Sequence, residues 1–431
     1  MALASISLRG FRNLEPTIVG FAEGSNYLFG PNGAGKTNLL EAIHYLATGR
    51  SFRRCPDADL LGFGRDVLIV SGTDESGATA EIRFDGREKR ILRNNIPMEK
   101  LSEYFGWLPV VVLLLEDIEL VLGSPGIRRS FLDVAIAKAG SGAKSEARSQ
   151  KLEARGEEQS YIALVGEYRR AVSQYNRLLE RHTAYGTQHM GAEEIAAWEE
   201  EVVRTGVPVY EARMAKVGGL LEGAAKHYER LAGHEAVFSY RSSIVSEGTR
   251  GTGHDPKSQG GFGSCPLDLA GAFRQRLAAT RERARYLGHA LVGPHRDDIR
   301  IVRGERELRK FGSVGEQRLA GIALRLAEAD MILSAGRQRP VFLLDEVASE
   351  LDEQRSRLVL AMVAERGQMV YAAARRMLQQ GSRDRGIEGS SGGPQSTAHD
   401  ASALDHLTTG ALEHFSGKEF HVEAGKVSEV S

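Results

Sequence analysis

Two short motifs near opposite ends of this 431-residue chain constrain its fold most strongly. Residues 30–37 read GPNGAGKT, and residues 341–352 read VFLLDEVASELD. The first is a glycine-rich loop of the phosphate-binding type, and the second is an apolar strand that ends in carboxylates. Such parts act together at one site, yet most of the chain separates Lys36 from Asp345. The sequence therefore predicts an α/β core with a large insertion.

The glycine-rich loop fits the pattern G-x-x-x-x-G-K-[ST] between a predicted strand and a predicted helix, the context that supports such a match. Its glycines let the backbone curl so that N–H groups face phosphate oxygens, and the helix N-terminus adds a favourable dipole. Lys36 is expected to reach the β- and γ-phosphates of ATP, and Thr37 to offer its hydroxyl to Mg²⁺. The alternative, a fortuitous glycine-rich turn, is disfavoured by this context. The residues predicted to contact the nucleotide are Gly30, Pro31, Asn32, Gly33, Ala34, Gly35, Lys36 and Thr37.

The acidic motif begins with a fully apolar run, residues 341–344, which predicts a buried parallel strand. Asp345 ends this strand, where a carboxylate can hold magnesium directly or through water. The next carboxylate, Glu346, is the candidate that polarises the attacking water. An Asp-Glu pair after a strand is as often structural, so the functional reading depends on the glycine-rich loop. Ser349 and Asp352 follow closely enough to line the same edge of the site.

A third segment, SVGEQR at residues 313–318, precedes a predicted amphipathic helix. Ser313 and Gly315 lie at its start, where a hydroxyl, a bare backbone and a helix N-terminus together suit a phosphate group. One nucleotide does not need two such clamps from one chain. The economical arrangement is a dimer in which each chain closes its clamp on the other chain's γ-phosphate; a plain helix cap is the alternative. The apolar face of the helix is predicted from Leu319, Ile322, Ala323, Leu326 and Leu333.

The composition is ordinary for a globular protein, with 42% hydrophobic and 26% charged residues. The dense apolar run at residues 110–115 is too short to span a bilayer and predicts a buried strand. The N-terminus has no basic segment before a long apolar core, and Cys55 and Cys265 cannot form a disulfide framework, so a cytoplasmic protein is expected. Because the net charge is −1, any binding of nucleic acid must depend on local basic patches.

Between the motifs, apolar periodicity predicts a helical arm. Apolar residues recur at alternating spacings of four and three from Tyr161 to Leu179. A second seam runs from Ile195 to Ala212, and Pro208 is expected to kink it. Two such helices predict an antiparallel pair; an ordinary helical subdomain is an equal alternative. The predicted organisation is 1–137 and 291–431 as two halves of one lobe, 138–290 as the arm, flexible loops near 138–160 and 246–264, a disordered tract at 381–403, and a strand pair at 419–430 that returns to the core.

Narrower motifs accompany these three, namely GRSFR at residues 49–53, P-x-x-R-R-x-F-L-D at 125–133 and GPHRDD at 293–298. In this order, the motifs resemble the ABC-type ATPases of DNA repair and, among them, the RecF family of bacterial recombination mediators. The Walker-type motifs are shared with many ATPases, whereas the combination of narrower motifs points to RecF. The stretches that carry the resemblance are residues 7–13, 30–53, 123–133, 293–298, 313–328 and 343–352, over nearly the whole chain.

The resemblance implies an α/β fold, with an ABC-type P-loop ATPase head as lobe I and an inserted helical arm as lobe II. It implies a weak ATPase that uses ATP and Mg²⁺ and acts mainly as a switch for DNA binding. ATP would drive homodimerisation, with DNA bound at single-strand gaps and junctions without sequence specificity. RecR and RecO are the implied partners, and RecA the protein loaded with their help. The implied roles are nucleotide and magnesium for Lys36 and Thr37, magnesium for Asp345, catalysis for Glu346 and Lys36, and the clamp in trans for Ser313 and Gly315.

The chain departs from the family pattern at two places. Glu316 stands where family members often carry glutamine, and a glutamate would repel the γ-phosphate unless it points away. The strand after the acidic motif usually ends in a threonine or histidine that senses the γ-phosphate, whereas here it ends in Ala372–Ala374. Hydrolysis is therefore expected to be slower than usual, unless Arg375 substitutes for the sensor.

Basic residues that contact DNA are expected on one predicted helix, where five arginines and one glutamate give a local positive excess. A solvated helix surface paired with acids is an equal alternative. Arg296, within GPHRDD, fits a buried polar network as well as it fits a DNA contact. The candidates on the helix are Arg274, Arg276, Arg281, Arg283 and Arg285, and further candidates are Arg53, Arg54, Arg128 and Arg129.

Other ATPase classes fit the chain less well. The ATPase subunit of a membrane transporter would be smaller and would not need GPHRDD, so no membrane partner is expected. A structural SMC-like protein would need coiled coils of hundreds of residues, whereas this arm has room for two helices. A small-molecule kinase would have no use for the SVGEQR segment.

Overall fold

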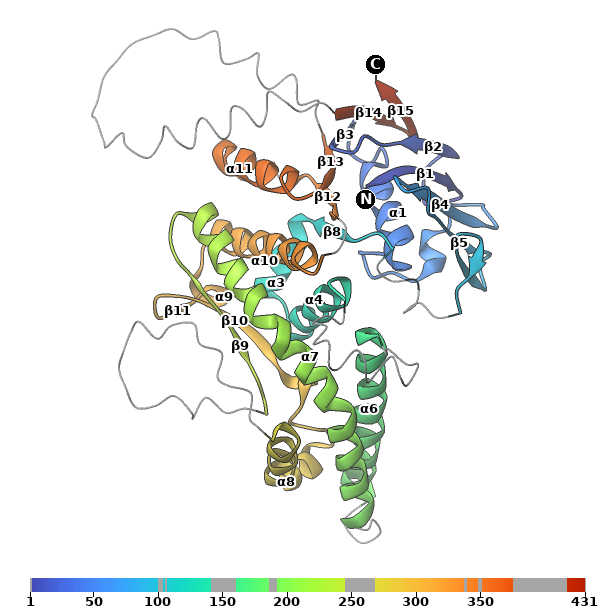
Figure 1. The fold of residues 1–431 in the computed structure, drawn as a ribbon. Coiled ribbons are helices and arrows are strands. Elements are labelled where there is room, and N and C mark those ends of the chain that lie inside the picture. Colours follow the sequence, from blue (N-terminus) through green and yellow to red (C-terminus); the bar gives the residue numbers. More distant parts are fainter. Residues whose placement is uncertain are drawn as a thin grey trace, which may run out of the picture. The chain divides into compact units, whose positions relative to one another are not determined.

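The chain divides into two compact units in the computed structural model (Figure 1). Unit 1 comprises Met1–Glu116 and Ile332–Ser431, and unit 2 comprises Asp117–Met331. Unit 1 is therefore built from both ends of the chain, as the split between the two motifs requires. The residues that the structure describes are 2–99, 104, 107–140, 160–185, 192–244, 268–336, 339–347, 351–374 and 417–430.

Among the described residues, unit 1 contains two six-stranded sheets. The first is antiparallel, with the order β2-β1-β4-β5-β6-β7. Alternating buried and exposed side chains along its strands are typical of a sheet with one face in the core. Its strands are β1 (Leu3–Arg9), β2 (Thr17–Gly20), β4 (Leu68–Asp74), β5 (Thr79–Phe84), β6 (Lys89–Arg93) and β7 (Ile96–Pro97).

The second sheet is mostly parallel, has the order β15-β14-β3-β13-β12-β8, and positions the site. Its central strand β3, near the N-terminus, pairs in parallel with β13 and β14 from the C-terminal part of the chain. The predicted strand pair at 419–430 is confirmed, because β14 and β15 form it and return to this core. The strands are β3 (Ser25–Phe29), β8 (Val110–Leu113), β12 (Val341–Asp345), β13 (Gln368–Ala373), β14 (Gly417–Glu423) and β15 (Lys426–Val430).

Helix α1 (Lys36–Thr48) follows the glycine-rich loop and contacts strands of both sheets of unit 1. Its predicted apolar face lies in the hydrophobic core, where Leu39, Leu40, Ile43 and Leu46 are fully buried. Because α1 is held on two sides, the loop at its N-terminus has a fixed position. Among the described residues, unit 1 also contains the 3₁₀ turn η1 (Asp57–Leu60) and helix α11 (Glu353–Ala364).

Unit 2 is mainly helical, with a three-stranded antiparallel sheet of order β11-β10-β9. Helix α10 begins in unit 2 and carries the predicted amphipathic pattern, with Leu319, Ile322, Ala323 and Leu326 buried. The elements are η2 (Leu115–Ile118) at the boundary, α3 (Glu119–Leu122), α4 (Pro125–Lys138), α6 (Tyr161–Tyr185), α7 (Ala192–Ala232), β9 (Val237–Arg241), α8 (Leu269–Leu287), η4 (Pro294–Arg296), β10 (Asp298–Arg303), β11 (Arg306–Glu307), α9 (Leu308–Phe311) and α10 (Val314–Ser334).

The helical arm is the pair α6 and α7, which lie side by side in Figure 1. Every residue of the first predicted seam is buried, from Tyr161 to Leu179. Most of the second seam is buried as well, with Trp198 half-buried, and α7 continues through Pro208 without a break in its assignment. The hydroxyl of Tyr175 joins the two helices by donating to Glu199, at 3.0 Å. The predicted pair of helices is therefore present.

The limits of the two units differ from the predicted domain limits. The predicted limits follow residues 137 and 290, whereas the units divide after residues 116 and 331. The difference arises because α4, which precedes the predicted arm, packs against α6, α7 and β10. Helix α4 therefore belongs to unit 2 together with the arm. Ser313 thus lies in unit 2, apart from the unit that contains the glycine-rich loop.

Two predicted segments, the loop at 246–264 and the tract at 381–403, lie outside the described residues, as do residues 141–159. In the part of the chain that the structure describes, no helix is long and apolar enough to cross a membrane.

Candidate nucleotide site

The glycine-rich loop joins β3 to α1 and requires glycine at two positions. Gly30 has φ +150°, and a Cβ there would lie 2.0 Å from the carbonyl oxygen of Val422. Gly35 has φ +114° and precedes the first turn of α1, and a Cβ there would lie 2.8 Å from a methyl carbon of Leu14. Any larger residue would push the loop away from its neighbours. The close packing therefore fixes the curled backbone on which phosphate binding depends.

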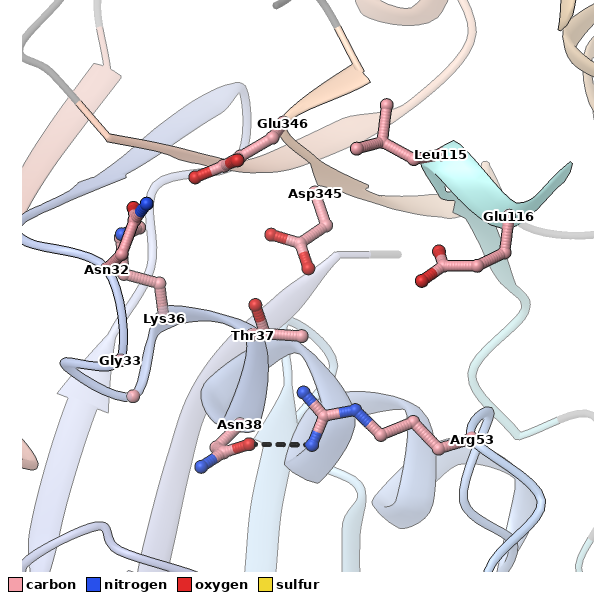
Figure 2. Close-up of a pocket in the computed structure, with 11 residues that line it drawn as sticks. Asn32, Gly33, Lys36, Thr37, Asn38, Arg53, Leu115, Glu116, Asp345 and Glu346 are labelled. Atoms are coloured by element: carbon pink, nitrogen blue, oxygen red, sulfur yellow. Dashed lines mark hydrogen bonds between the residues drawn. The ribbon is translucent and has the colours of Figure 1, made fainter.

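An open pocket of about 350 Å³ lies against this loop (Figure 2). The loop lines one part of it, and the carboxylates after β12 line another, so both ends of the chain contribute. The two motifs singled out in the sequence therefore do meet in space. The lining residues are Asn32, Gly33, Gly35, Lys36, Thr37, Asn38, Arg53, Leu115, Glu116, Asp345 and Glu346.

Lys36 is the first residue of α1, and its ammonium group lies inside the loop. Its Nζ donates to the carbonyl oxygens of Gly30, at 2.8 Å, and Pro31, at 3.0 Å, and the residue is only 5% exposed. Ala34 has a buried side chain, and its carbonyl oxygen accepts from the backbone of Gly425 at 2.9 Å, so it supports the loop from behind. The loop thus holds one buried positive charge next to its backbone N–H groups, an arrangement suited to phosphate.

The carboxyl end of β12 brings Asp345 to the pocket. Figure 2 shows its carboxylate pointing toward the Thr37 hydroxyl. Burial raises the pKa of Asp345; a hydrogen bond with Thr37 opposes this rise, and the negative charges of Glu346 and Glu116 add to it. A carboxylate beside a hydroxyl is a pair of hard oxygen donors, and Mg²⁺ is usually bound by one or two carboxylates together with phosphate oxygens. The residues present therefore fit magnesium.

Glu346 follows Asp345 with an unusual backbone. Its φ is +50°, in the left-handed region that few residues other than glycine adopt, and its N–H donates to the carbonyl of Ala372 at 3.0 Å. Strained conformations of this kind cluster at functional sites, where the surrounding structure holds them in place. The turn directs the Glu346 side chain to the pocket lining. Its role toward water stays a prediction.

The sequence reasoning missed Glu116, which also lines the pocket. Glu116 follows β8, the strand that pairs in parallel with β12, so its carboxylate lies at the same edge of the sheet as Asp345. The signal was available, because residues 110–115 were recognised as a buried strand and a carboxylate directly follows them. Only the strand order identifies that carboxylate as a neighbour of the acidic motif.

Arg53, predicted as a possible DNA contact, lines the nucleotide pocket. Its Nη1 donates to Asn38 Oδ1 at 2.9 Å, shown in Figure 2, and to Glu41 Oε2 at 3.0 Å. Glu41 is fully buried and also accepts two hydrogen bonds from the guanidinium of Arg12, at 2.8 and 2.9 Å. Bonds to Glu41 hold the Arg12 pKa above its ordinary value. The network secures α1 beneath the loop.

The other residues proposed around the acidic motif have separate positions. Asp352 caps α11 by accepting from the backbone of Arg355 at 2.9 Å, and it does not line the pocket. Ala372 is fully buried in β13 as the register partner of Asp345. Ser349 and Arg375 lie outside the described residues.

Ser313 and Gly315 begin α10 in unit 2. A Cβ added at Gly315 would meet open space among the residues that the structure describes, so this part of the backbone is accessible there. The clamp in trans stays a prediction.

The arginines of α8 are mostly paired, which favours the alternative of a solvated helix surface. Arg274 bonds to Glu200 and Arg281 to Glu199, both from α7. In α4, Arg128 is 3% exposed and bonds to Asp298 at 2.6 Å. The partners that neutralise these arginines come from other elements, so a local count of charges along the sequence overestimates the basic surface.

GPHRDD forms a buried polar network in unit 2. Asp297 is fully buried and accepts from the hydroxyl of Tyr240, at 2.6 Å, and from Ser243. His295 bonds to the hydroxyl of Tyr168 at 2.6 Å, and burial lowers the pKa of His295 to about 4. Arg296 donates to the carbonyl of Ala290 at 2.7 Å. The motif therefore connects α6, β9 and the loop before β10 around the buried Asp297, whereas the Arg296 side chain is exposed, so its contact with DNA stays a prediction.

The fold and the pocket define a P-loop ATPase head of the ABC type with an inserted helical arm. Residues 2–393 match the family described as the RecF/RecN/SMC N terminal domain, and the chain belongs to the RecF family. It is 32% identical over 376 residues to the DNA replication and repair protein RecF of Symbiobacterium thermophilum, covering 85% of this chain and 89% of that protein. It is 30% identical over 377 residues to the protein of the same name from Citrifermentans bemidjiense, with coverages of 86% and 92%.

A solved structure agrees with this assignment of the fold. The structure of the recombination mediator protein RecF-ATP in the RecFOR pathway has a TM-score of 0.75 to this chain at 23% identity, covering 100% of this chain and 98% of that one. The likeness shows that the fold is the α/β head predicted from the motifs.

Proposed function

We propose that this chain is an ATP-dependent DNA-binding protein of DNA replication and repair, in which a weak ATPase acts as a switch. The observation that carries the proposal is the pocket, where the glycine-rich loop meets Asp345 and Glu346. The RecF relatives named as DNA replication and repair proteins are covered almost end to end, which supports this function over that of a structural SMC-like protein.

The chemistry follows from the lining of the pocket. Lys36 and the loop backbone bind the β- and γ-phosphates of ATP. Thr37 and Asp345 would hold Mg²⁺, which would neutralise part of the phosphate charge during the reaction. Glu346 orients and polarises the attacking water. Slow hydrolysis is expected, because β13 presents alanine where a polar sensor of the γ-phosphate usually stands.

ATP drives the formation of a homodimer in this proposal. Ser313 and Gly315 of one chain close on the γ-phosphate bound by the other, and DNA binds to the dimer at single-strand gaps or junctions without sequence specificity. RecR and RecO act as partners, and RecA loading is the indirect result. The cytoplasm is the expected location.

Light scattering with and without ATP tests the proposal. The wild type should be monomeric without nucleotide and dimeric with ATP, and the dimer should bind a gapped DNA duplex. Ser313→Arg should remain monomeric in ATP while it binds nucleotide normally, because its own pocket lies in unit 1. Ser428→Arg, at an exposed serine of β15, is the matched control and should dimerise. If Ser313→Arg dimerises like the wild type, the clamp in trans is wrong.

A further inference from the structure

Glu316, which departs from the family pattern, is turned back onto Ser313. Its Oε2 accepts from the Ser313 N–H at 2.8 Å and from the Ser313 hydroxyl at 3.1 Å. In return, the Glu316 N–H donates to Ser313 Oγ at 3.3 Å. This reciprocal arrangement is a capping box, in which two residues satisfy the free N–H groups of a helix start. The carboxylate thus occupies the same donors of Ser313 that the proposed clamp offers to a γ-phosphate.

The other carboxylate oxygen of Glu316 is held by two further elements. Arg303 of β10 forms an ion pair with Oε1, and His234, in the turn between α7 and β9, lies with its Nε2 at 3.2 Å from the same atom. The Glu316 side chain is only 15% exposed. Three elements therefore fix its position.

We propose that Glu316 is a positioning residue that competes with the γ-phosphate of a second chain for Ser313, and so sets the ATP concentration at which the dimer forms. The inference rests on the proposed function, because it assumes the clamp in trans. An arriving phosphate must displace the carboxylate from the N–H and hydroxyl of Ser313. The displaced Glu316 carboxylate remains close to the negatively charged γ-phosphate. Arg303 offsets part of the repulsion between them.

Removing the charge of Glu316 and removing the charge of Arg303 should therefore shift the ATP concentration needed for dimerisation in opposite directions. Glu316→Gln removes the competing charge but can still close the capping box, since glutamine serves at this position as well. Its half-maximal ATP concentration for dimerisation should fall roughly 3- to 10-fold. Arg303→Gln leaves Glu316 less neutralised, so its half-maximal ATP concentration should rise by a similar factor. Both shifts should shrink in high salt, because screening weakens charge effects.

Two matched variants control for net charge. Glu305→Gln removes an exposed charge from the turn between β10 and β11, and Arg306→Gln removes one from the first residue of β11; both lie close in sequence to Arg303 and should dimerise like the wild type. Light scattering across an ATP titration gives the half-maximal concentration, and a thermal melt of each variant reports on the helix cap. Glu316→Gln should melt at the wild-type temperature.

Each other outcome overturns a defined part of the proposal. If the wild type dimerises with ATP but Glu316→Gln shifts no more than Glu305→Gln, the inference is wrong and the proposed function stands. If Glu316→Gln shifts but also melts several degrees lower, Glu316 acts as a structural cap and the inference is wrong. If the wild type does not dimerise in ATP, the proposed function fails and the inference fails with it.

Discussion

At the scale of single residues, Asp345 has a position that favours chemistry over stability. It is partly buried beside two other carboxylates of the pocket, Glu346 and Glu116, and burial raises its pKa. An isolated protein gains nothing from gathering negative charges at one edge of a sheet. A cation bound beside Asp345 would remove this cost, which is the physical reason for proposing magnesium at Asp345 and Thr37.

Replacing Asp345 by asparagine should therefore raise the stability of the fold and strongly slow ATP hydrolysis. A carboxyl group whose pKa is higher in the folded than in the unfolded chain stabilises the fold at low pH, and this contribution is lost as pH rises through the folded pKa. At pH 8, Asp345→Asn should melt roughly 1–3 °C above the wild type, and the difference should vanish below about pH 3, where aspartate is protonated in the folded and the unfolded chain. ATP hydrolysis should fall about 100-fold or more.

Thermal melts at several pH values and a phosphate-release assay check this prediction. Asp66→Asn, at an exposed aspartate of the same unit, is the control and should change neither property. A lower melting temperature of Asp345→Asn at pH 8 would contradict the proposed cost of the buried charge.

The glycine-rich loop and Asp345 were predictable, because each motif carries its chemistry in a short local pattern. Glu116 and Arg53 were not assigned to the site, since their roles depend on which strand lies beside β12 and on the buried Glu41 beneath the loop. Three-dimensional neighbours supply that information, and a single sequence does not.

At the scale of elements, α7 shows how closely the arm is packed. A Cβ added at Gly206 would lie 2.8 Å from ring carbons of both Tyr168 in α6 and Phe273 in α8. A Cβ added at Gly219, further along the same helix, would meet open space. The two glycines therefore differ in effect. Gly206 permits α6, α7 and α8 to approach closely, whereas Gly219 only lowers the helix propensity of α7.

Alanine at these two positions should have opposite effects. Gly206→Ala should destabilise the protein by about 1–3 kcal/mol, because the added methyl group forces the rings of Tyr168 and Phe273 apart. Gly219→Ala should stabilise it by roughly 0.5–1 kcal/mol, because it adds helix propensity without a clash. Urea unfolding followed by circular dichroism measures both. Equal effects of the two substitutions would show that packing against α6 and α8 does not decide the cost.

The helical seam was predictable because apolar residues at heptad spacing belong to one face of one helix. The charge on α8 was not, since Glu199 and Glu200, which neutralise Arg281 and Arg274, come from α7. Periodicity within an element can be read from its own residues, whereas ion pairing between elements requires the fold.

At the scale of the whole molecule, charge is almost balanced, with 56 lysines and arginines against 57 aspartates and glutamates. A protein with so little net charge has a weak long-range attraction for DNA. Affinity for DNA must then come from a small number of local contacts with phosphates. Several arginines of α8 are already in ion pairs with glutamates and contribute less to such contacts. A dimer makes twice the number of DNA contacts that one chain makes. ATP-driven dimerisation would therefore control DNA binding without any change in the residues that contact DNA.

The salt dependence of binding should reveal this doubling. The logarithm of the DNA affinity falls linearly with the logarithm of salt concentration, with a slope of about −0.9 per phosphate contacted. The slope for the wild type in ATP should be about twice that for Ser313→Arg, and it should be the same for two gapped duplexes of unrelated sequence. Fluorescence anisotropy at four or five salt concentrations measures both slopes. Equal slopes for the two proteins would mean that DNA binds a single chain, and a preference above about 10-fold for one duplex would mean that bases are read directly.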